Sequence, residues 1–190
     1  MKSSGSLRVS MLEPEDLVEL MRSAAARGAS TAASSHITGS SGADSGSSSA
    51  ASAGAGYGPG EYCIVDVRDD DFAGGNISGA LHCSSESFSR SGVYRLAGML
   101  CADSSNMNIG SVDSANASAV VPVPVKCKLF VFHCMMSQQR GPACAEEFAR
   151  HCDASPDVHT HDLQVVVLRG GFRKWKHRYQ GRSDLCENEQ

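Results

Sequence analysis

Three short, largely apolar runs limit what this chain can fold into. They are YCIVDV at 62–67, KLFVFH at 128–133 and QVVVL at 164–168, and all are rich in β-branched or aromatic residues. Runs of this kind are typical of strands that are buried on both faces, as in parallel sheets covered by helices. Helical patterns separate the runs, so the sequence predicts a single α/β domain with a parallel sheet flanked by helices.

The helical patterns are recognised by their spacing and by their first turns. Residues 13–27 (EPEDLVELMRSAAAR) carry Leu, Met and Ala at three- and four-residue steps, behind a proline and acidic residues that suit a helix start. Further helices are expected within 85–100, from about Pro142, and around Trp175, which is most simply a core residue.

Composition divides the chain into a folded core and low-complexity segments. Residues 29–58 are mostly Gly, Ala, Ser and Thr, and cannot bury enough apolar surface to offset the entropy of ordering. We therefore expect a disordered linker there and a second flexible insertion at about 102–122. Residues 1–28 should supply an N-terminal strand and helix, residues 59–180 the core of the domain, and residues 181–190 a tail.

Charge and cysteine content exclude several classes of protein. The formal net charge of −4 gives no reason to expect nucleic acid, and no apolar run reaches the ~20 residues that a membrane helix needs. The eight cysteines are spread singly, and the N-terminus has no apolar stretch like that of a signal peptide. The sequence therefore predicts mostly free thiols in a reducing compartment, in the cytoplasm, the nucleus or both.

The segment LFVFHCMMSQQRGPACAEEF, residues 129–148, joins a predicted strand to a predicted helix through Cys134 and Arg140. Ligands of α/β sheets bind beyond the carboxyl ends of the strands, which is where Cys134 falls. The N–H groups and dipole of a following helix favour an anion there, and such cysteines can titrate at roughly pH 3.5–7.5. Arg140 supplies a planar fork of donors that matches a tetrahedral oxyanion.

We therefore predict Cys134 as a nucleophile and Arg140 as an oxyanion ligand. The flanking strand and helix distinguish the segment from a chance Cys-x₅-Arg spacing, in which a buried structural cysteine would lie near a surface arginine. The five residues between them form the expected oxyanion-binding loop: Met135, Met136, Ser137, Gln138 and Gln139.

These residues resemble a known family. HCMMSQQRGPAC is similar to the active-site segment of the arsenate reductases and cell-cycle-type dual-specificity phosphatases of the rhodanese superfamily, especially the small plant members. IVDVRDDDFAGGNISGALH at 64–82 and LRGGFRKW at 168–175 resemble the superfamily's two signatures, and EPEDLVELM fits its first helix. The resemblance implies a rhodanese-like sheet.

The resemblance also implies covalent catalysis through Cys134. Loops of five residues are typical of the phosphatase and arsenate-reductase branch, whereas sulfur-transferring rhodaneses typically have four. The expected substrates are arsenate or a phosphoprotein, with glutathione and a glutaredoxin as reductant for arsenate and no bound cofactor. The alternatives are a sulfurtransferase that carries a Cys134 persulfide, or a catalytically idle module that binds a partner.

Other residues receive roles from the superfamily pattern. Asp66 and Arg68 are expected to brace the loop by hydrogen bonds rather than to act in catalysis. His133 either tunes the pKa of Cys134 or only ends the strand. Cys144 is expected to be a packed helix cysteine, with a resolving thiol as the alternative.

The sequence departs from the family in ways that bear on the substrate. The loop has no acidic residue, so arsenate and aryl phosphates are expected to react better than alkyl phosphates, and Asp69, Asp70 and Asp71 are the first candidates for an acid from elsewhere. Val67 stands where the cell-cycle phosphatases have a protective cysteine. No metal site is predicted, since the spacing of His151, Cys152, His159 and His161 matches no zinc template, and Cys186 alone remains of the Cys-rich tail of the plant relatives.

Overall fold

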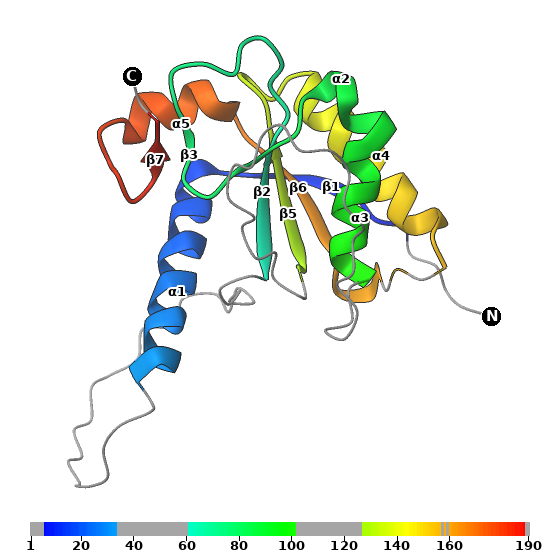
Figure 1. Cartoon of the computed structure of the whole chain (residues 1–190), viewed down its shortest axis with the longest axis horizontal. Helices are drawn as coiled ribbons and strands as arrows, with labels where there is room; N and C mark the ends of the chain where they lie inside the picture. Colours follow the sequence, from blue (N-terminus) through cyan, green and yellow to red (C-terminus); the bar gives the residue numbers. More distant parts are fainter. Residues whose placement is uncertain (1–5, 34–60, 102–126, 157, 159, 189–190) are drawn as a thin grey trace, which may run out of the picture.

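The computed structural model describes residues 6–33, 61–101, 127–156, 158 and 160–188 (Figure 1). Its centre is a parallel five-stranded sheet with the strand order β1-β6-β5-β2-β4. The strands are β1 (Val9–Leu12), β2 (Tyr62–Asp66), β4 (Leu81–His82), β5 (Leu129–His133) and β6 (Gln164–Leu168). The three strands predicted from the apolar runs and the parallel α/β architecture are thus confirmed.

The carboxyl ends of the central strands meet at one edge of the sheet. Asp66 of β2 pairs with His133 of β5, and Phe132 pairs with Val167 of β6. The segments that leave these strands therefore start side by side, and the Val67 N–H donates to the carbonyl of His133 at 2.8 Å. This register brings the three sequence motifs to the same edge.

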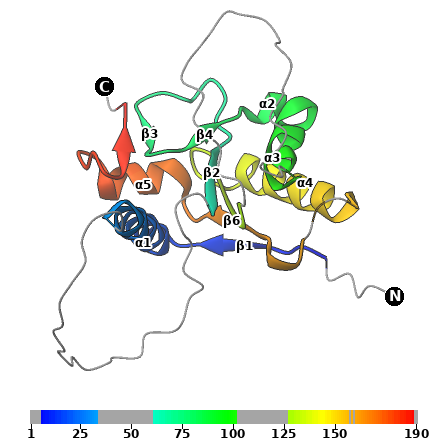
Figure 2. The ribbon, with the colours of Figure 1, turned by 60° about the horizontal axis from the view of Figure 1, so that its bottom comes forward.

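Helices cover both faces of the sheet (Figures 1 and 2). One face carries α1 (Pro14–Ala33) and α5 (Gly171–Tyr179), and the other carries α2 (Ser85–Ser87), the π-helical turn Phe88–Gly92, α3 (Val93–Cys101) and α4 (Arg140–Ala154). A 3₁₀ turn, Thr160–Asp162, precedes β6. Two apolar layers result, with Trp175 and Leu17 buried on the first face and Phe88 and Phe148 on the second.

The helices lie where the spacing predicted them, with one correction. Helix α1 continues to Ala33, so residues 29–33, which we had assigned to the linker, are helical. The extension is rich in alanine, which has the highest helix propensity and adds a turn to an established helix at little cost. The remainder of the predicted linker and the insertion at about 102–122 lie outside the described residues.

The C-terminal segment is part of the fold rather than a separate tail, which corrects our division of the chain. Strand β7 (Cys186–Glu187) pairs antiparallel with β3 (Asn76–Ile77) in a small second sheet. Leu185 is 1% exposed, and its carbonyl accepts hydrogen bonds from the Trp175 indole at 3.2 Å and from the Ser78 N–H at 3.0 Å. The segment packs because Leu185 and Cys186 close the apolar layer under α5.

Leu185→Ala should therefore destabilise the whole domain. Truncating a buried leucine removes transfer free energy and leaves a cavity, and we expect the free energy of unfolding to fall by about 2–5 kcal/mol. Urea unfolding followed by circular dichroism measures the change. Ser183→Ala, at an exposed position two residues away, is the control and should stay within about 0.5 kcal/mol of the parent. A loss of stability no larger than that of the control would show that the segment is not packed.

Candidate active site

Cys134 follows directly on β5 and lies at the start of a tight loop. Its thiol is buried, and Sγ accepts a hydrogen bond from the Ser137 N–H at 3.2 Å, while the Cys134 N–H donates to Ser137 Oγ at 3.4 Å. Ser137 adopts a φ of 53°, a left-handed conformation that turns the chain back toward the cysteine. The two hydrogen bonds with Ser137 thus fix the position of Cys134 at the start of the loop.

The first turn of α5 holds the outer side of this loop. The Phe172 N–H donates to the Cys134 carbonyl at 2.9 Å, and the Arg173 N–H donates to the Met135 carbonyl at 2.8 Å. In a planar trans peptide the C=O and the N–H point in opposite directions, so the N–H groups of Met135 and Met136 point away from α5. Among the described residues neither N–H has an acceptor, so both can serve an anion.

Gly171 lets α5 come this close. Its φ is +58°, and a Cβ placed there would meet the Met135 carbonyl oxygen at 2.7 Å and press against the Cys134 carbonyl. Both atoms belong to the backbone and cannot move without moving the loop. Sequence reasoning used Gly170 and Gly171 only as part of the LRGGFRKW signature, although the Gly-Gly pair was the available signal for a close backbone approach.

Arg140 begins α4, and its guanidinium is bound by two carboxylates from the loop after β2. Nη1 and Nη2 donate to the two oxygens of Asp71 at 2.7 and 2.5 Å, and Nη1 also donates to Asp69 at 2.9 Å. The hydrogen bonds that Arg140 donates to Asp71, and to a smaller extent to Asp69, raise the pKa of Arg140. The hydrogen bond from Arg140 lowers the pKa of Asp71 to about 2. Burial disfavours the charge of Asp69, but hydrogen bonds from Ser85 and Arg140 outweigh it and lower that pKa also.

This pairing leaves one edge of the guanidinium available. Arg140 has five N–H donors, and the carboxylates take both on Nη1 and one on Nη2. The donors that remain, on Nε and Nη2, lie along the same edge of the planar group and form a two-point fork. Within the described residues no acceptor is bonded to Nε. The carboxylates therefore hold Arg140 and still leave it able to bind an oxyanion.

Cys134 and Arg140 line one hollow of about 430 Å³. The loop residues Met135, Met136, Gln138 and Gln139 line it with them, and Asp71 and Arg173 complete it. Ser137 is the one predicted loop residue that does not line it, because its side chain turns back to the Cys134 N–H. The structure thus gathers the predicted nucleophile, the predicted oxyanion ligand, the candidate acid Asp71 and one residue that sequence reasoning had not placed here, Arg173.

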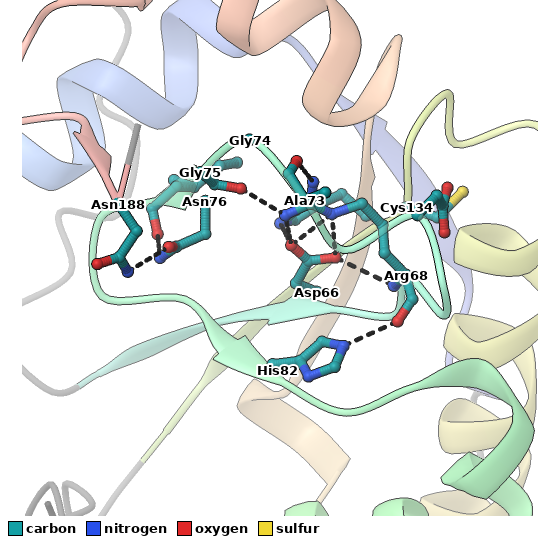
Figure 3. A network of polar contacts seen from close by, with 12 residues as sticks. Asp66, Arg68, Ala73, Gly74, Gly75, Asn76, His82, Cys134 and Asn188 are labelled. Carbon is teal, nitrogen blue, oxygen red and sulfur yellow. Dashed lines mark hydrogen bonds and ion pairs between the residues drawn. The ribbon is translucent and has the colours of Figure 1, made fainter. Parts of the chain in front are cut away.

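Asp66 and Arg68 form a fully buried ion pair beside this loop (Figure 3). Arg68 donates to Asp66 through Nε and Nη2, to the Gly75 carbonyl at 2.8 Å and to the Ala73 carbonyl at 3.4 Å. We expected this pair to brace the Cys134 loop by hydrogen bonds. In the described part of the chain its bonds instead run to the turn at 73–75, because that turn offers unpaired carbonyls to a buried cation.

The contact between this ion pair and the loop is made by an aromatic ring. The Arg68 guanidinium lies 4.0 Å from the centroid of the Phe172 ring, which has its backbone N–H on the Cys134 carbonyl. A cation over an aromatic face is favourable, and more so when both are buried. The ion pair therefore supports the catalytic loop through Phe172 rather than directly.

His133 is fully buried. Neither ring nitrogen has a hydrogen-bond partner among the described residues, and Nε2 lies 3.8 Å from Asp66 Oδ2. Burial lowers its pKa, and this outweighs the opposite effect of Asp66. Of the two roles considered from sequence, an imidazolium that stabilises the thiolate is thus disfavoured.

The remaining candidates lie outside the hollow. Cys144 is buried on α4, and burial raises the pKa of its thiol to about 12, which suits packing better than attack on a disulfide. Free thiols are found at Cys63, Cys83, Cys127, Cys134 and Cys144. His159 and the side chain of His161 lie outside the described residues, and within those residues no group of three potential metal ligands occurs. No helix in the described ranges is long and apolar enough to cross a membrane.

No family model matches the chain, but curated relatives do. It is 28% identical to the dual specificity phosphatase ibp1 of Schizosaccharomyces pombe over 68% of this chain and 85% of the relative. It is 30% identical to the CDC25-like phosphatase YCH1 of Saccharomyces cerevisiae over 61% and 66% of the two chains. It is 29% identical to arsenate reductase 2.1 of Oryza sativa over 60% of this chain and 55% of that one, so it matches little more than half of the rice protein.

Solved structures share the fold. Ygr203w, a yeast protein tyrosine phosphatase of the rhodanese family, superposes with a TM-score of 0.55 at 21% identity, covering 94% of this chain and 91% of the other. The As-Sb reductase of Leishmania major gives 0.51 at 22% identity, covering 94% and 85%. Fold and site together define a rhodanese-like domain with a cysteine at the start of the loop between β5 and α4. Its curated relatives are Cdc25-like and dual-specificity phosphatases and an arsenate reductase, and they support a cysteine-dependent enzyme.

Gly171→Ala should disable the loop without unfolding the domain. The added methyl would strain a left-handed φ and push the Cys134 and Met135 carbonyls away from α5. We expect kcat/KM to fall by at least about 100-fold, comparable to the loss of an oxyanion donor. Activity is measured beside a circular dichroism spectrum. Gly181→Ala, also at a positive φ but with open space around its Cβ, is the matched control and should keep activity. Equal effects of the two substitutions would contradict a role for the α5 contact.

Proposed function

We propose that this chain is a cysteine-dependent enzyme for tetrahedral oxyanions, acting on arsenate and on aryl phosphates such as phosphotyrosine. The observation that supports it best is the single hollow lined by Cys134 and Arg140. The named activities of the relatives, phosphatases and an arsenate reductase, agree with this choice of substrates.

In the phosphatase reaction the Cys134 thiolate attacks phosphorus. A sulfur–phosphorus bond forms as the bond to the leaving oxygen breaks, and the leaving group departs with the electron pair. The Met135 and Met136 amides and the free edge of Arg140 bind the non-bridging oxygens. Water then attacks the thiophosphate and releases phosphate and the thiolate.

In the arsenate reaction sulfur attacks arsenic and a hydroxide leaves. The thiol of glutathione then attacks the Cys134 sulfur, and the sulfur–arsenic bond breaks with its electron pair on arsenic, which leaves as trivalent arsenite. A glutaredoxin thiol reduces the resulting disulfide between Cys134 and glutathione and restores the Cys134 thiol. We propose a glutaredoxin as partner for this step. A cytoplasmic or nuclear location would suit both reactions, since Cys134 has to remain a thiol.

The carboxylates near the hollow do not favour proton donation. A general acid works best with a pKa near the working pH, whereas the pKa of Asp71 is about 2 while it binds Arg140. Asp69 is held ionised in the same way. A phenolate or an arsenate hydroxide leaves with less need of a proton than an alkoxide, so phosphoserine should be the poorest substrate. We therefore assign Asp69 and Asp71 to holding Arg140.

Two other functions are less well supported. A sulfurtransferase would carry its persulfide in a shorter loop, whereas five residues separate Cys134 from Arg140 here. A binding module without catalysis would have no need of a buried thiol and a held guanidinium on one hollow.

Cys134→Ser should abolish turnover of both arsenate and p-nitrophenyl phosphate, because a serine hydroxyl is not ionised near neutral pH. The assays use arsenate with glutathione and glutaredoxin, p-nitrophenyl phosphate, a phosphoserine peptide, and thiosulfate with cyanide. Cys144→Ala is the control and should retain at least half of the activity. Substantial phosphatase activity in Cys134→Ser would refute the nucleophile, and dominant turnover of thiosulfate would favour the sulfurtransferase.

The Asp71→Asn variant tests whether Asp71 holds Arg140 in place or donates a proton to the leaving group. A neutral amide holds Arg140 less well, and we expect kcat/KM for p-nitrophenyl phosphate to fall about tenfold, or ~1.4 kcal/mol. The pairing of Asp71 with Arg140 is complete above the ordinary pKa of 3.8 and is lost only as the pH falls through about 2. The rate profile from pH 5 to 8 should therefore keep its shape in the variant. If the rate of the parent falls toward alkaline pH and that of Asp71→Asn does not, Asp71 would be the general acid.

A further inference from the structure

A second hollow, of about 740 Å³, lies next to the catalytic one along α5. Met135, Met136, Gln138 and Arg173 line both, so the two are continuous at the catalytic loop. The catalytic chemistry described above uses none of the α5 side chains in this second hollow. A substrate larger than a single oxyanion would extend into this second hollow. The residues that line both hollows would contact the part of the substrate outside the oxyanion.

One face of α5 forms the floor of this hollow. Arg173, Lys176, His177 and Gln180 line it, and their spacing of three, four and seven residues places them on the same side of a helix. The hollow thus extends for about 10 Å along the helix at 1.5 Å per residue. That length matches about three residues of an extended peptide at ~3.3 Å each.

The hollow is positively charged in an otherwise acidic chain. Arg173, Lys174 and Lys176 line it, and no carboxylate does so within the described residues. Lys174 is neutralised by Glu13 at 3.1 Å. Lys176 donates to the Gly74 carbonyl at 2.6 Å, which satisfies a donor but leaves the charge uncompensated.

Arg173 is the cation best placed to bind a substrate. Its backbone N–H is fixed on the Met135 carbonyl, so its side chain starts from the catalytic loop itself. The side chain is exposed, and among the described residues it has no acidic partner. Arg178, on the same helix, provides a contrast, since it is paired with Glu15 and lines neither hollow.

We propose that this hollow binds the acidic flank of a phosphotyrosine-containing peptide, with Arg173 and Lys176 pairing with carboxylates next to the phosphorylated residue. The inference rests on the proposed function for the phosphate itself. Gln138 and Gln180 also line the hollow and supply neutral amides, which pair readily with peptide groups. Arg173 is thus a specificity residue that selects substrates with a second negative charge close to the first.

Binding to the full-length Cys134→Ser protein tests the proposal without turnover. Two fluorescent phosphotyrosine peptides are compared by anisotropy, one with Asp and Glu at the two positions on each side and one with Asn and Gln there. We expect the acidic peptide to bind about fivefold more tightly, the upper end for exposed charge pairs. The ratio of the two Kd values should shrink when sodium chloride is raised from roughly 50 to 300 mM, because salt screens exposed charges.

Substitutions on α5 then assign the preference to a residue. In the Cys134→Ser background, Arg173→Gln should reduce the Kd ratio to below about twofold, and Arg173→Glu should reverse it, through loss and inversion of one exposed charge pair. Arg178→Gln removes the same charge from the same helix and should keep the parent ratio. Arg173 is exposed, so its substitution should leave the fold intact, and thermal unfolding of each variant checks this.

The outcomes separate the specificity proposal from the proposed function. An unchanged ratio in Arg173→Gln, an equal loss in Arg178→Gln, or no difference between the peptides in the parent would overturn the acidic-flank site. Failure of both peptides to bind would overturn it as well. Turnover of p-nitrophenyl phosphate by the unaltered enzyme is measured independently. If the enzyme cleaves this small ester but binds both peptides equally, the proposed function stands and only the acidic-flank site is refuted.

Discussion

The backbone contact between α5 and the catalytic loop is the interaction on which the rest of the site depends. Two N–H groups at the start of α5 bind two successive loop carbonyls, and Gly171 permits the approach because it has no side chain. Because the loop carbonyls point toward α5, the N–H groups of the same peptide units point in the opposite direction. The geometry of the anion site is therefore set by a helix that follows β6, more than thirty residues further along the chain.

A buried charge pair stabilises this contact from the other side. Asp66 and Arg68 have lost their hydration, and the cost is offset by their own bonds, by the carbonyls of the turn at 73–75 and by the Phe172 ring. Lys176 donates to Gly74 in the same turn. The turn and α5 are thus tied together, and the Asp69–Asp71 segment that holds Arg140 lies between Arg68 and this turn. Removing one partner of the ion pair would leave a buried charge uncompensated and loosen several parts of the site at once.

Local sequence signals predicted the helices and the three central strands β2, β5 and β6, because each is encoded within a single short segment. The strand before Cys134 and the helix after Arg140 could be recognised from apolar runs and a proline alone. The partners of Arg140 could not, since Asp71 lies 69 residues earlier and meets it only through the parallel register of β2 and β5. The tail was misassigned for a similar reason. Two buried residues, Leu185 and Cys186, give too short a pattern to reveal a strand whose partner, β3, is itself two residues long.

Charge around the hollow explains how a site with two carboxylates can bind an anion. Asp69 and Asp71 together outweigh Arg140, and Arg173 is the other Lys or Arg among the described residues that line the hollow. With Arg173 counted, the side chains of Asp69, Asp71, Arg140 and Arg173 sum to zero, and the Cys134 thiolate of the proposed reaction adds one negative charge. Attraction for an oxyanion therefore falls to the loop amides and to the N-terminus of α4, worth roughly half a positive charge. Backbone dipoles neither titrate nor move. Side chains without a net positive charge do not attract anions in general over long distances. The site is thereby suited to an oxyanion that fits the loop. A second negative charge on the substrate would need a separate cation, which α5 provides in Arg173.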